Sequence, residues 1–349
     1  MSDRPRVSVI IPNYNHARYL PQRIASVLNQ TYRDTEVLLM DDLSTDNSRE
    51  IIPPLVAGDN RVRLLFNEKN SGSGYRQWNK GVLEAQGEYV WIAESDDWAE
   101  PTLLEKLVEK LEAHPNVGVA YCQSWRIVDD TGERYNNIVW TSDLGSDRWE
   151  RDFVVSGMAE CQRYLCQKNT VPNASGVVFR RDVFRAVGGA PEGIRLSADW
   201  LLWLKMLKVS DLAYVSEPLN YFRQVSGSVT DRTRRDGAMA RETYEMAQWI
   251  LQEFDLDTEV QELIYDKAFY VWTHPQFVQG ERLSAHRNQE IYRKAKTIDP
   301  HMNQRLMHRF AQEAARKSPG LLPLWRIARR AASLPQRIQG RILRRGRQG

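Results

Sequence analysis

The sequence contains little cysteine and no long apolar run. Its 349 residues include three cysteines, Cys122, Cys161 and Cys166, which do not form the Cys-x-x-Cys pair of a metal or redox site. This usage is typical of reduced thiols in a cytosolic protein. No stretch approaches the roughly 18 consecutive apolar residues that a membrane-spanning helix requires. Residues 1–6 lead directly into a strand-like run without a cleavable apolar segment, so we expect no secretory signal.

Two common enzyme motifs are also missing. A nicotinamide-dependent enzyme would carry Gly-x-Gly-x-x-Gly after its first strand, where this chain has Pro12-Asn-Tyr-Asn15. The lone Gly72-Ser-Gly74 is more typical of a flexible turn. The six histidines show no His-Glu-x-x-His or other zinc spacing.

Acidic residues are absent from the C-terminal end. Residues 316–349 hold ten Lys or Arg and no Asp or Glu, so the first 315 residues carry 38 bases against 45 acids. The body of the chain therefore lacks the net positive charge that is typical of a nucleic-acid-binding protein. From Leu321 onward, apolar residues and Trp325 alternate with arginines, which is typical of an amphipathic helix on an anionic membrane surface. The alternatives are a helix pair packed on protein and a disordered basic end.

Strand-like and helix-like patterns alternate in the first 123 residues. β-branched and apolar runs at residues 7–11, 36–42, 62–66 and 89–93 predict strands, and apolar residues at helical spacing lie between them. Alternation of this kind predicts an α/β fold with a mostly parallel sheet flanked by helices. The later chain is mixed, with strands expected at 126–128 and 175–179, and helices at 196–208 and over most of 239–317, with breaks near Pro275 and Pro300.

Polar turns follow each of these four strands, and ligands of parallel α/β sheets bind at the carboxyl ends of the strands. The last turn carries two adjacent carboxylates, Asp96 and Asp97, which repel one another unless a cation or several donors are present. Mg²⁺ is commonly held by one or two carboxylates together with substrate phosphates. The alternative is that either aspartate simply favours the N-terminus of a helix expected to begin at Pro101.

Several motifs in their observed order resemble glycosyltransferase family 2, a large family of inverting enzymes with the GT-A (Rossmann-like) fold. The matching motifs are residues 7–15, 41–47, 87–92, 95–97 and 198–200, and the resemblance covers roughly residues 6–223. It implies a GT-A domain over residues 1–230, with a nucleotide-sugar-binding half at 1–123 and an acceptor-binding half at 124–230. We expect a helical extension at 231–317 and a basic amphipathic tail at 318–349.

The resemblance implies roles on the donor side of the site. The matching donor-binding positions are Pro12, Tyr14, Asn15, Asp42 and Asp96. Pro12 and Tyr14 would line the nucleobase pocket, and Asp42 would accept the N3–H of uracil, although the N1–H of guanine is also a suitable donor. Asp96 would lie near the ribose. Asp97 matches the ligand of a divalent cation, Mg²⁺ or Mn²⁺, that neutralises charge on the departing nucleotide.

On the acceptor side, Asp199 matches the catalytic base, which would take the proton of the acceptor hydroxyl. The alternative is that Ser197 or Asp199 only caps the following helix. Trp98, Asn173 and Trp200 are expected acceptor contacts because Trp can stack on sugar C–H faces, with a core position as the alternative for either Trp.

Two positions depart from the family pattern. Relatives often carry Glu before the base, where this chain has Ala198. Relatives also often read Ala-Arg-Asn-x-Gly before the acidic strand, and here Trp78 stands in place of the donor-contacting Arg. We hypothesise that Arg76 substitutes as a donor contact.

We therefore expect transfer of one sugar from a UDP- or dTDP-linked donor to a hydroxyl of a glycan or lipid-linked glycan, with inversion. The expected location is the cytoplasm, at the inner face of the membrane if the tail docks there. A processive polysaccharide synthase would bring membrane spans and Gln-x-x-Arg-Trp, and neither is found. The alternative function is a nucleotide-sugar-binding or scaffolding protein of the same fold that lacks turnover.

Overall fold

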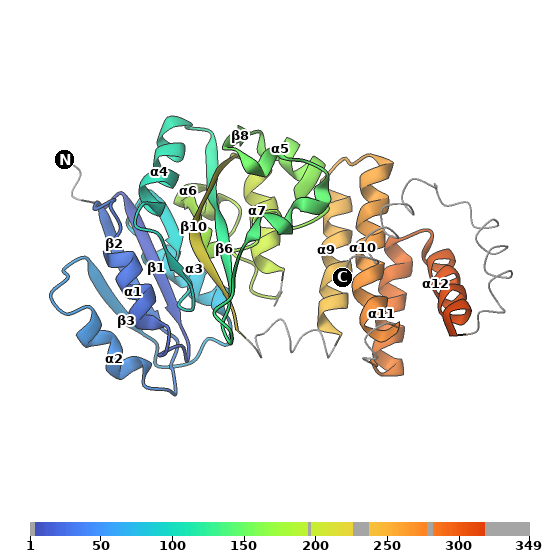
Figure 1. Cartoon of the computed structure of the whole chain (residues 1–349), viewed down its shortest axis with the longest axis horizontal. Coiled ribbons are helices and arrows are strands. Elements are labelled where there is room, and N and C mark those ends of the chain that lie inside the picture. Colours follow the sequence, from blue (N-terminus) through green and yellow to red (C-terminus); the bar gives the residue numbers. More distant parts are fainter. Residues whose placement is uncertain (1–3, 195–196, 226–236, 278–281, 318–349) are drawn as a thin grey trace. The chain divides into compact units, whose positions relative to one another are not determined.

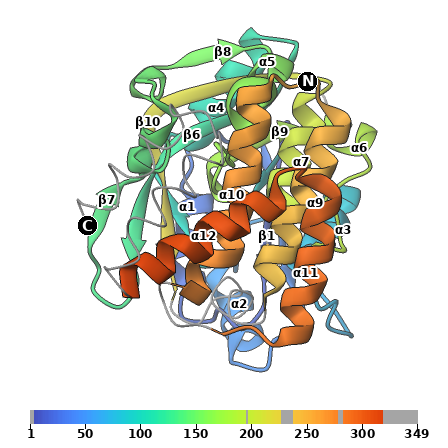
Figure 2. The same ribbon diagram turned by 90° about the vertical axis from the view of Figure 1, so that its right-hand side faces the viewer.

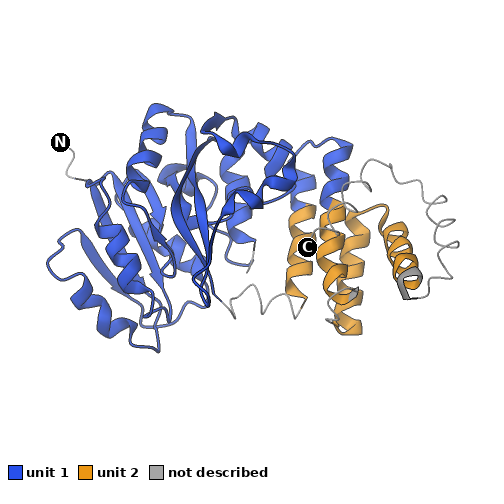
Figure 3. Cartoon of the chain, viewed as in Figure 1, with its two compact units in different colours: residues 1–234, 249–264 blue, residues 235–248, 265–349 orange. Residues whose placement is uncertain are grey.

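The computed structural model describes residues 4–194, 197–225, 237–277 and 282–317. The basic tail at 318–349 lies outside the described residues. The described chain belongs to two compact units, one formed by Met1–Arg234 with Trp249–Ile264 and the other by Arg235–Gln248 with Tyr265–Gly349 (Figure 3). The first unit contains the sheet and all the candidate site residues. No helix of the described residues is long and apolar enough to cross a membrane.

The first half of the sheet is parallel, as expected (Figure 1). Strands β1 (Val7–Asn13), β2 (Thr35–Asp41), β3 (Val62–Phe66) and β4 (Tyr89–Ile92) lie in the order β3-β2-β1-β4. The connecting helices are α1 (Leu20–Leu28), α2 (Ser48–Leu55) and α3 (Gly74–Glu84), and α4 (Leu103–Ala113) follows β4. Because the four strands run in one direction, the turns after them meet at one edge.

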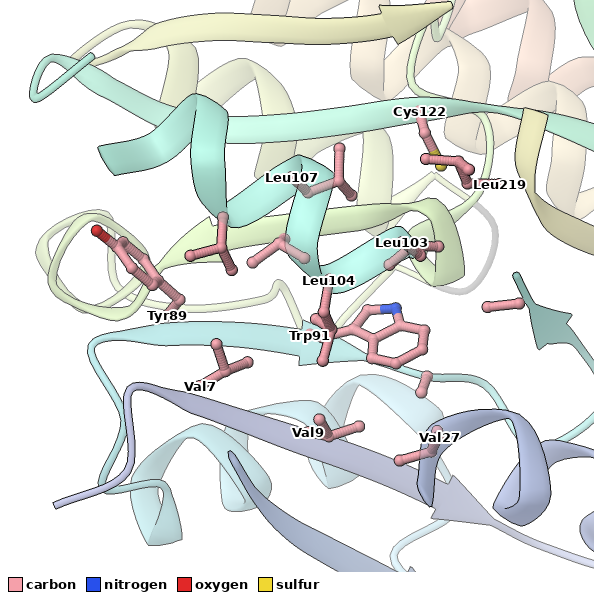
Figure 4. Packing of buried hydrophobic residues seen from close by; sticks show 14 of the residues in the cluster. Val7, Val9, Val27, Tyr89, Trp91, Leu103, Leu104, Leu107, Cys122 and Leu219 are labelled. Atoms are coloured by element: carbon pink, nitrogen blue, oxygen red, sulfur yellow. The ribbon is translucent and has the colours of Figure 1, made fainter. Parts of the chain in front are cut away.

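Alternating side chains of β1 are buried on both faces of the sheet, which explains its continuous apolar run. Val9 belongs to a core cluster with Val27 of α1 and Leu104 of α4, around the indole of Trp91 (Figure 4). On the other face α3 lies so close that a Cβ atom added at Gly81 would meet Ile10 at 2.6 Å. Helix α3 therefore needs glycine at this position to pack on the sheet.

The second half of the sheet is mixed. Its strands are β5 (Trp98–Ala99), β6 (Val117–Val128), β7 (Arg134–Asn136), β8 (Phe153–Val155), β9 (Val177–Arg180) and β10 (Asp211–Gln224). Strand β9 is antiparallel to both β4 and β6 and joins the two halves, whereas β6 and β10 are parallel. Helices α5 (Gly157–Glu160), α6 (Arg181–Ala186) and α7 (Ala198–Leu207) connect these strands.

One expectation about an element boundary is wrong. Helix α4 begins at Leu103 and not at Pro101, because the preceding Trp98–Ala99 stays extended to pair with β10. The strand expected at 126–128 is the end of a longer strand, β6, since β10 pairs along its length. The breaks near Pro275 and Pro300 are confirmed. Helix α10 (Thr258–Phe277) ends shortly after Pro275, and Pro300 lies between α11 (Ala285–Ile298) and α12 (Met302–Lys317).

The second unit is helical (Figure 2) and has its own buried hydrophobic cluster. It contains parts of α9 (Ala238–Glu253) and α10, together with α11 and α12. Tyr244, Trp272 and Ile291 belong to its buried cluster. The nearly buried Arg305 guanidinium pairs with Asp299 at 2.7 Å and also with Asp266. Burial of the cation is thus balanced by two carboxylates of the same unit.

Candidate active site

The turns after β1 and β2 are held together by side-chain hydrogen bonds. Oδ1 of Asn15 accepts from the backbone amide of Thr45 at 2.7 Å, and the Asn15 amide donates to the Ser44 hydroxyl at 2.9 Å. Asn15 and Leu43 both adopt left-handed backbone conformations, with φ of 58° and 61°. Such conformations are uncommon for residues other than glycine and often mark functional turns.

Asp42 lies at the end of β2, where only 4% of its surface is exposed. Its Oδ1 accepts from the Asn67 amide group at 2.7 Å, the Ser71 backbone at 2.8 Å and the Gln77 amide group at 2.9 Å. Within the described part of the chain, its Oδ2 accepts only from the Ser71 hydroxyl, at 2.7 Å. One carboxylate oxygen is therefore saturated, while the other retains acceptor capacity.

The other predicted nucleobase residues surround the same strand ends but differ in exposure. Pro12 is buried within β1, and Tyr14 is 47% exposed immediately after the strand. The side chain of Asn15 is occupied by the turn at Thr45. Tyr14 is therefore the member of this group whose ring is most open to a ligand.

Arg76 and Trp78 project from α3 to different partners. The exposed Arg76 donates to the Ser71 carbonyl at 2.8 Å and to Glu192 at 3.1 Å. The buried Trp78 donates its indole N–H to Oε1 of Glu94 at 2.6 Å. The position at which the family resemblance implied an arginine thus holds a neutral donor that binds the acidic strand end.

Three carboxylates gather immediately after β4. Burial, with a contribution from Asp96, raises the pKa of Glu94 to about 8, and the same two influences raise the pKa of Asp97 to about 6. Burial also raises the pKa of Asp96. Burial therefore favours the neutral form of these carboxyls, and a nearby cation would favour the ionised form.

Asp97 is held from two sides. Its Oδ1 accepts from the backbone amide of Arg223 at 2.8 Å, and its Oδ2 accepts from the Asn173 amide group at 3.2 Å. Each oxygen keeps a further lone pair that could face a cation. The described residues contain no group of three or more His, Cys, Asp or Glu able to enclose a metal. This donor set fits Mg²⁺ or Mn²⁺ held by one or two carboxylates and substrate phosphates, and it does not fit an all-protein cage.

Arg223, at the end of β10, joins the acidic turn to two aromatic rings. Its guanidinium donates to the Asp96 carbonyl at 2.8 Å and to Asp129 at 3.0 Å, and lies over the rings of Tyr19 and Trp98. The Trp98 ring also stacks on Tyr221, with centroids 4.7 Å apart. Trp98 is therefore part of a packed cluster, and its expected contact with the acceptor stays a prediction.

A second cation, Arg23 of α1, lies behind the acidic turn. Its side chain is fully buried, and its Nε donates to the Glu94 carbonyl at 2.7 Å. Burial lowers the pKa of Arg23 to about 10, against the pull of Asp97 and Asp96, so the guanidinium remains charged at neutral pH.

Asp199 is the second residue of α7, and its Oδ2 accepts from the Asn169 amide group at 3.2 Å. Burial raises the pKa of Asp199 to about 6, while the amides at the helix start and Asn169 act in the opposite direction. Ser197, the N-cap residue, makes no side-chain capping bond. Trp200 donates its indole N–H to the Leu165 carbonyl at 2.8 Å.

Short chain segments, through the hydrogen bonds of their side chains, connect the surroundings of the three key aspartates. Asn169 contacts Asp199 and Asn173 contacts Asp97, and four residue steps of extended chain span at most about 14 Å. On the other side, Asp42 accepts from Gln77, whose neighbour in α3 donates to the acidic turn. Asp97 and Asp199 are therefore held by opposite ends of one five-residue segment, and Asp42 is linked to the acidic turn through α3.

The sequence analysis missed several residues of this region, namely Arg23, Glu94, Asn169 and Arg223. Arg23 gave a readable signal, because it interrupts the apolar stripe formed by Leu20, Ile24 and Val27 of α1. The other three gave none, since their partners lie far away in the sequence.

Known proteins share both the sequence and the fold of this chain. The model of glycosyl transferase family 2 matches residues 8–188. The glycosyltransferase GlyG of Streptococcus pneumoniae serotype 4 is 28% identical over 241 residues, which cover 69% of this chain and 77% of GlyG.

Two solved structures are similar at lower sequence identity. S. aureus TarS (1–349) in complex with UDP-GlcNAc superposes with a TM-score of 0.61 at 17% identity, covering 93% of this chain and 87% of TarS. The mannosyltransferase PcManGT of Pyrobaculum calidifontis, in complex with GDP-Man and Mn²⁺, gives a TM-score of 0.52 at 16% identity, covering 94% and 86%.

The shared architecture defines a GT-A glycosyltransferase fold. The match of the family model over more than half of the sequence identifies the chain further: it belongs to glycosyltransferase family 2.

Proposed function

We propose that this glycosyltransferase moves one sugar from a nucleoside-diphosphate sugar, UDP- or dTDP-linked, to a hydroxyl of a glycan acceptor, with inversion and with the help of Mg²⁺ or Mn²⁺. The observation that carries the proposal is the placement of Asp97 and Asp199. They accept hydrogen bonds from Asn173 and Asn169, the two ends of one five-residue segment, which supports a shared site for a metal-binding carboxylate and a base.

On the donor side, Oδ2 of Asp42 is the oxygen that would accept the imide N–H of uracil or thymine. This requires the Ser71 hydroxyl to share or leave that oxygen, because the carboxylate is otherwise enclosed. Tyr14, exposed beside it, offers its ring to the base. TarS is in complex with UDP-GlcNAc and PcManGT with GDP-Man, so the fold accommodates either nucleotide class in those proteins.

At the acidic turn, Asp97 would hold the cation, with Asp96 beside it. The bound ion supplies charge neutralisation at the departing nucleoside diphosphate. The chain itself fixes Asp97 through the Arg223 amide and Asn173, so the carboxylate needs little rearrangement to accept a ligand.

At the acceptor side, Asp199 would take the proton of the attacking hydroxyl. A pKa of about 6 leaves its carboxylate mostly ionised at neutral pH yet more basic than an exposed aspartate. Asn169 orients the carboxylate, and Asn173, Trp98 and Trp200 remain the proposed acceptor contacts. Ala198 supplies no second carboxylate, so the base acts without the glutamate that often precedes it in relatives.

The acceptor is proposed to be a growing glycan, free or lipid-linked. A lipid-linked acceptor would be met at the membrane surface, where the basic residues of the tail would favour anionic lipid. The tail lies outside the described residues, so this part of the proposal rests on its sequence alone.

A panel of nucleotide sugars, incubated with the full chain and Mn²⁺, Mg²⁺ or EDTA, tests the proposal through the nucleoside diphosphate released. We expect release of UDP or dTDP from one donor, greater with metal than with EDTA. Tight donor binding without release from any donor, with or without glycan acceptors, would instead identify a nucleotide-sugar-binding protein.

A further inference from the structure

The packing around the fully buried Arg23 does not explain why a charged residue occupies this position. It occupies the apolar stripe of α1, and its guanidinium carbon lies 5.6 Å from the centroid of the Trp91 ring. Only Nε has a hydrogen-bond acceptor, whereas Nη1 and Nη2 find none among the described residues although both are buried. A buried charge with two unpaired donor groups is unfavourable unless nearby charges of opposite sign stabilise it.

The carboxylates that face Arg23 belong to the acidic turn. Its electrostatic attraction is to Asp97 first, then to Asp96 and Glu94. The other nearby cation, Arg223, already has its own partners, because its guanidinium binds Asp129 and Gln22. Arg23 is therefore the buried cation of the described chain whose main electrostatic partners are the proposed metal-site carboxylates.

Helix α3 contacts the acidic turn through a neutral group. Here Trp78 donates a neutral N–H to Glu94. The same acidic turn is contacted from the opposite direction by Arg23, whose Nε binds the Glu94 backbone. A neutral donor from α3 and a cation from α1 thus meet at one residue.

We propose that Arg23 is a positioning residue that supplies, from α1, the fixed positive charge behind the acidic turn. Before ligands bind, it balances the carboxylates of Asp96 and Asp97. Once a divalent cation occupies those carboxylates, the guanidinium adds to the positive potential that attracts a nucleoside diphosphate. The second effect rests on the proposed function, whereas the first does not.

Removal of the Arg23 guanidinium should change the affinity for the cation and the affinity for the nucleotide in opposite directions. A loss of structure would not produce this pattern. Removal of the guanidinium makes the turn more negative, so Mn²⁺ alone should bind more tightly. UDP, added at saturating Mn²⁺, should bind more weakly because one positive charge is missing. Even with the full screening of bulk water, a unit charge about 4 Å away changes an affinity by roughly fivefold, so we expect each affinity to change by at least about that factor. A variant that only loosens the site would weaken both ligands.

The experiment is calorimetric titration of the full-length R23M protein with Mn²⁺ alone, and then with UDP at saturating Mn²⁺. R23K, which keeps the charge, should remain near the parent in both titrations. R63M is the matched control. Arg63 of β3 is a partly exposed arginine of the same unit, and it pairs with Glu84 of α3, away from the acidic turn. It should change neither affinity.

A charge-relocation series decides the question even if R23M fails to fold. W78R adds a second cation beside Glu94, so we expect weaker Mn²⁺ binding and tighter UDP binding, the reverse of R23M. The double variant R23M/W78R should return both affinities toward the parent values. Circular dichroism and thermal unfolding identify any variant that is not folded.

Equal changes of both affinities in one direction, or no change in either, for folded R23M would overturn the inference. A double variant that binds both ligands more weakly than either single variant would also overturn it. If R23M does not fold, a W78R protein that binds both ligands more weakly would also overturn the inference. Failure of the parent protein to bind UDP would count against the proposed function alone, because the Mn²⁺ arm would still test Arg23.

Discussion

At the scale of single residues, burial sets the chemistry of the candidate site. Asp97 and Asp199 have similar raised pKa values of about 6, yet their surroundings differ. Asp97 lies beside other carboxylates and two arginines, which suits a group that exchanges one cation for another. Among the described residues, the donors that reach Asp199 are amides, which suits a group that gains and loses a proton.

The pH dependence of turnover should reflect Asp199. A base must be deprotonated to act, and its folded-state pKa is about 6, so kcat at saturating metal should fall as the pH drops through about 6. N169A removes a donor that stabilises the ionised carboxylate, so the acidic limb should move upward by roughly half to one unit. Measured pH–rate profiles of the two proteins check this, and an unchanged limb in N169A would separate Asn169 from the base.

Replacement of the aspartates themselves should separate their roles. D97N should abolish metal-dependent turnover and weaken Mn²⁺ binding. D199N should lower kcat by at least a hundredfold, the usual contribution of a general base, while UDP still binds. Nucleotide release and calorimetry on both variants check these outcomes. Near-normal turnover of D199N would assign the base elsewhere.

Sequence reasoning reached the carboxylates but not the residues that support them. Asp42, Asp97 and Asp199 stand in recognisable motifs or at strand ends, where local pattern is informative. Asn169 and Arg223 could not be found in this way, because their contacts to Asp199 and Asp97 cross 30 and 126 residues of chain. Such contacts depend on strand order, which periodicity does not determine.

At the scale of elements, the end of β10 fixes the acidic turn to the rest of the sheet. The backbone amide of Arg223 donates to Asp97, and its guanidinium pairs with Asp129, whose carboxylate is only 5% exposed. The expected short strand at 126–128 proved to be the end of β6, paired with this part of β10. Pairing across the sheet decides where both strands end, and neither end was marked by a turn signal in the sequence.

Removal of the Arg223 side chain should therefore destabilise the first unit. R223M leaves Asp129 with the Tyr19 hydroxyl and one mostly exposed cation, Arg18, so we expect a loss of roughly 2 kcal/mol in the free energy of unfolding. R18M is the matched control, because Arg18 pairs with the same carboxylate but is 71% exposed, and it should cost less than about 0.5 kcal/mol. Urea unfolding measures both. Equal losses in the two variants would show that burial does not distinguish these ion pairs.

At the scale of the whole molecule, the sequence predicted the α/β domain and the helical region that follows it. The boundary of the sheet-containing unit is less simple than a single cut in the chain, because Trp249–Ile264 belongs to it while Arg235–Gln248 belongs to the second unit. Two long helices, α9 and α10, thus contribute to both units. A helical periodicity shows which face is apolar, but not which core receives it.

The basic tail is expected to bring the enzyme to anionic membranes. The full chain should sediment with vesicles containing phosphatidylserine, and a chain ending at Lys317 should not, since ten basic residues fall to two. Vesicles of phosphatidylcholine alone provide the control and should retain neither protein. Equal sedimentation of the two chains with anionic vesicles would remove the tail from this role.

The five residues from Asn169 to Asn173 have a consequence for how such an enzyme can diversify. In the proposed function they set the spacing between the metal-binding carboxylate and the base, so lengthening or shortening them by one residue would misalign the displacement itself. Insertions on either side of this segment leave that spacing intact. New glycan preferences can therefore arise through the flanking loops, whereas this segment should tolerate substitutions only at constant length.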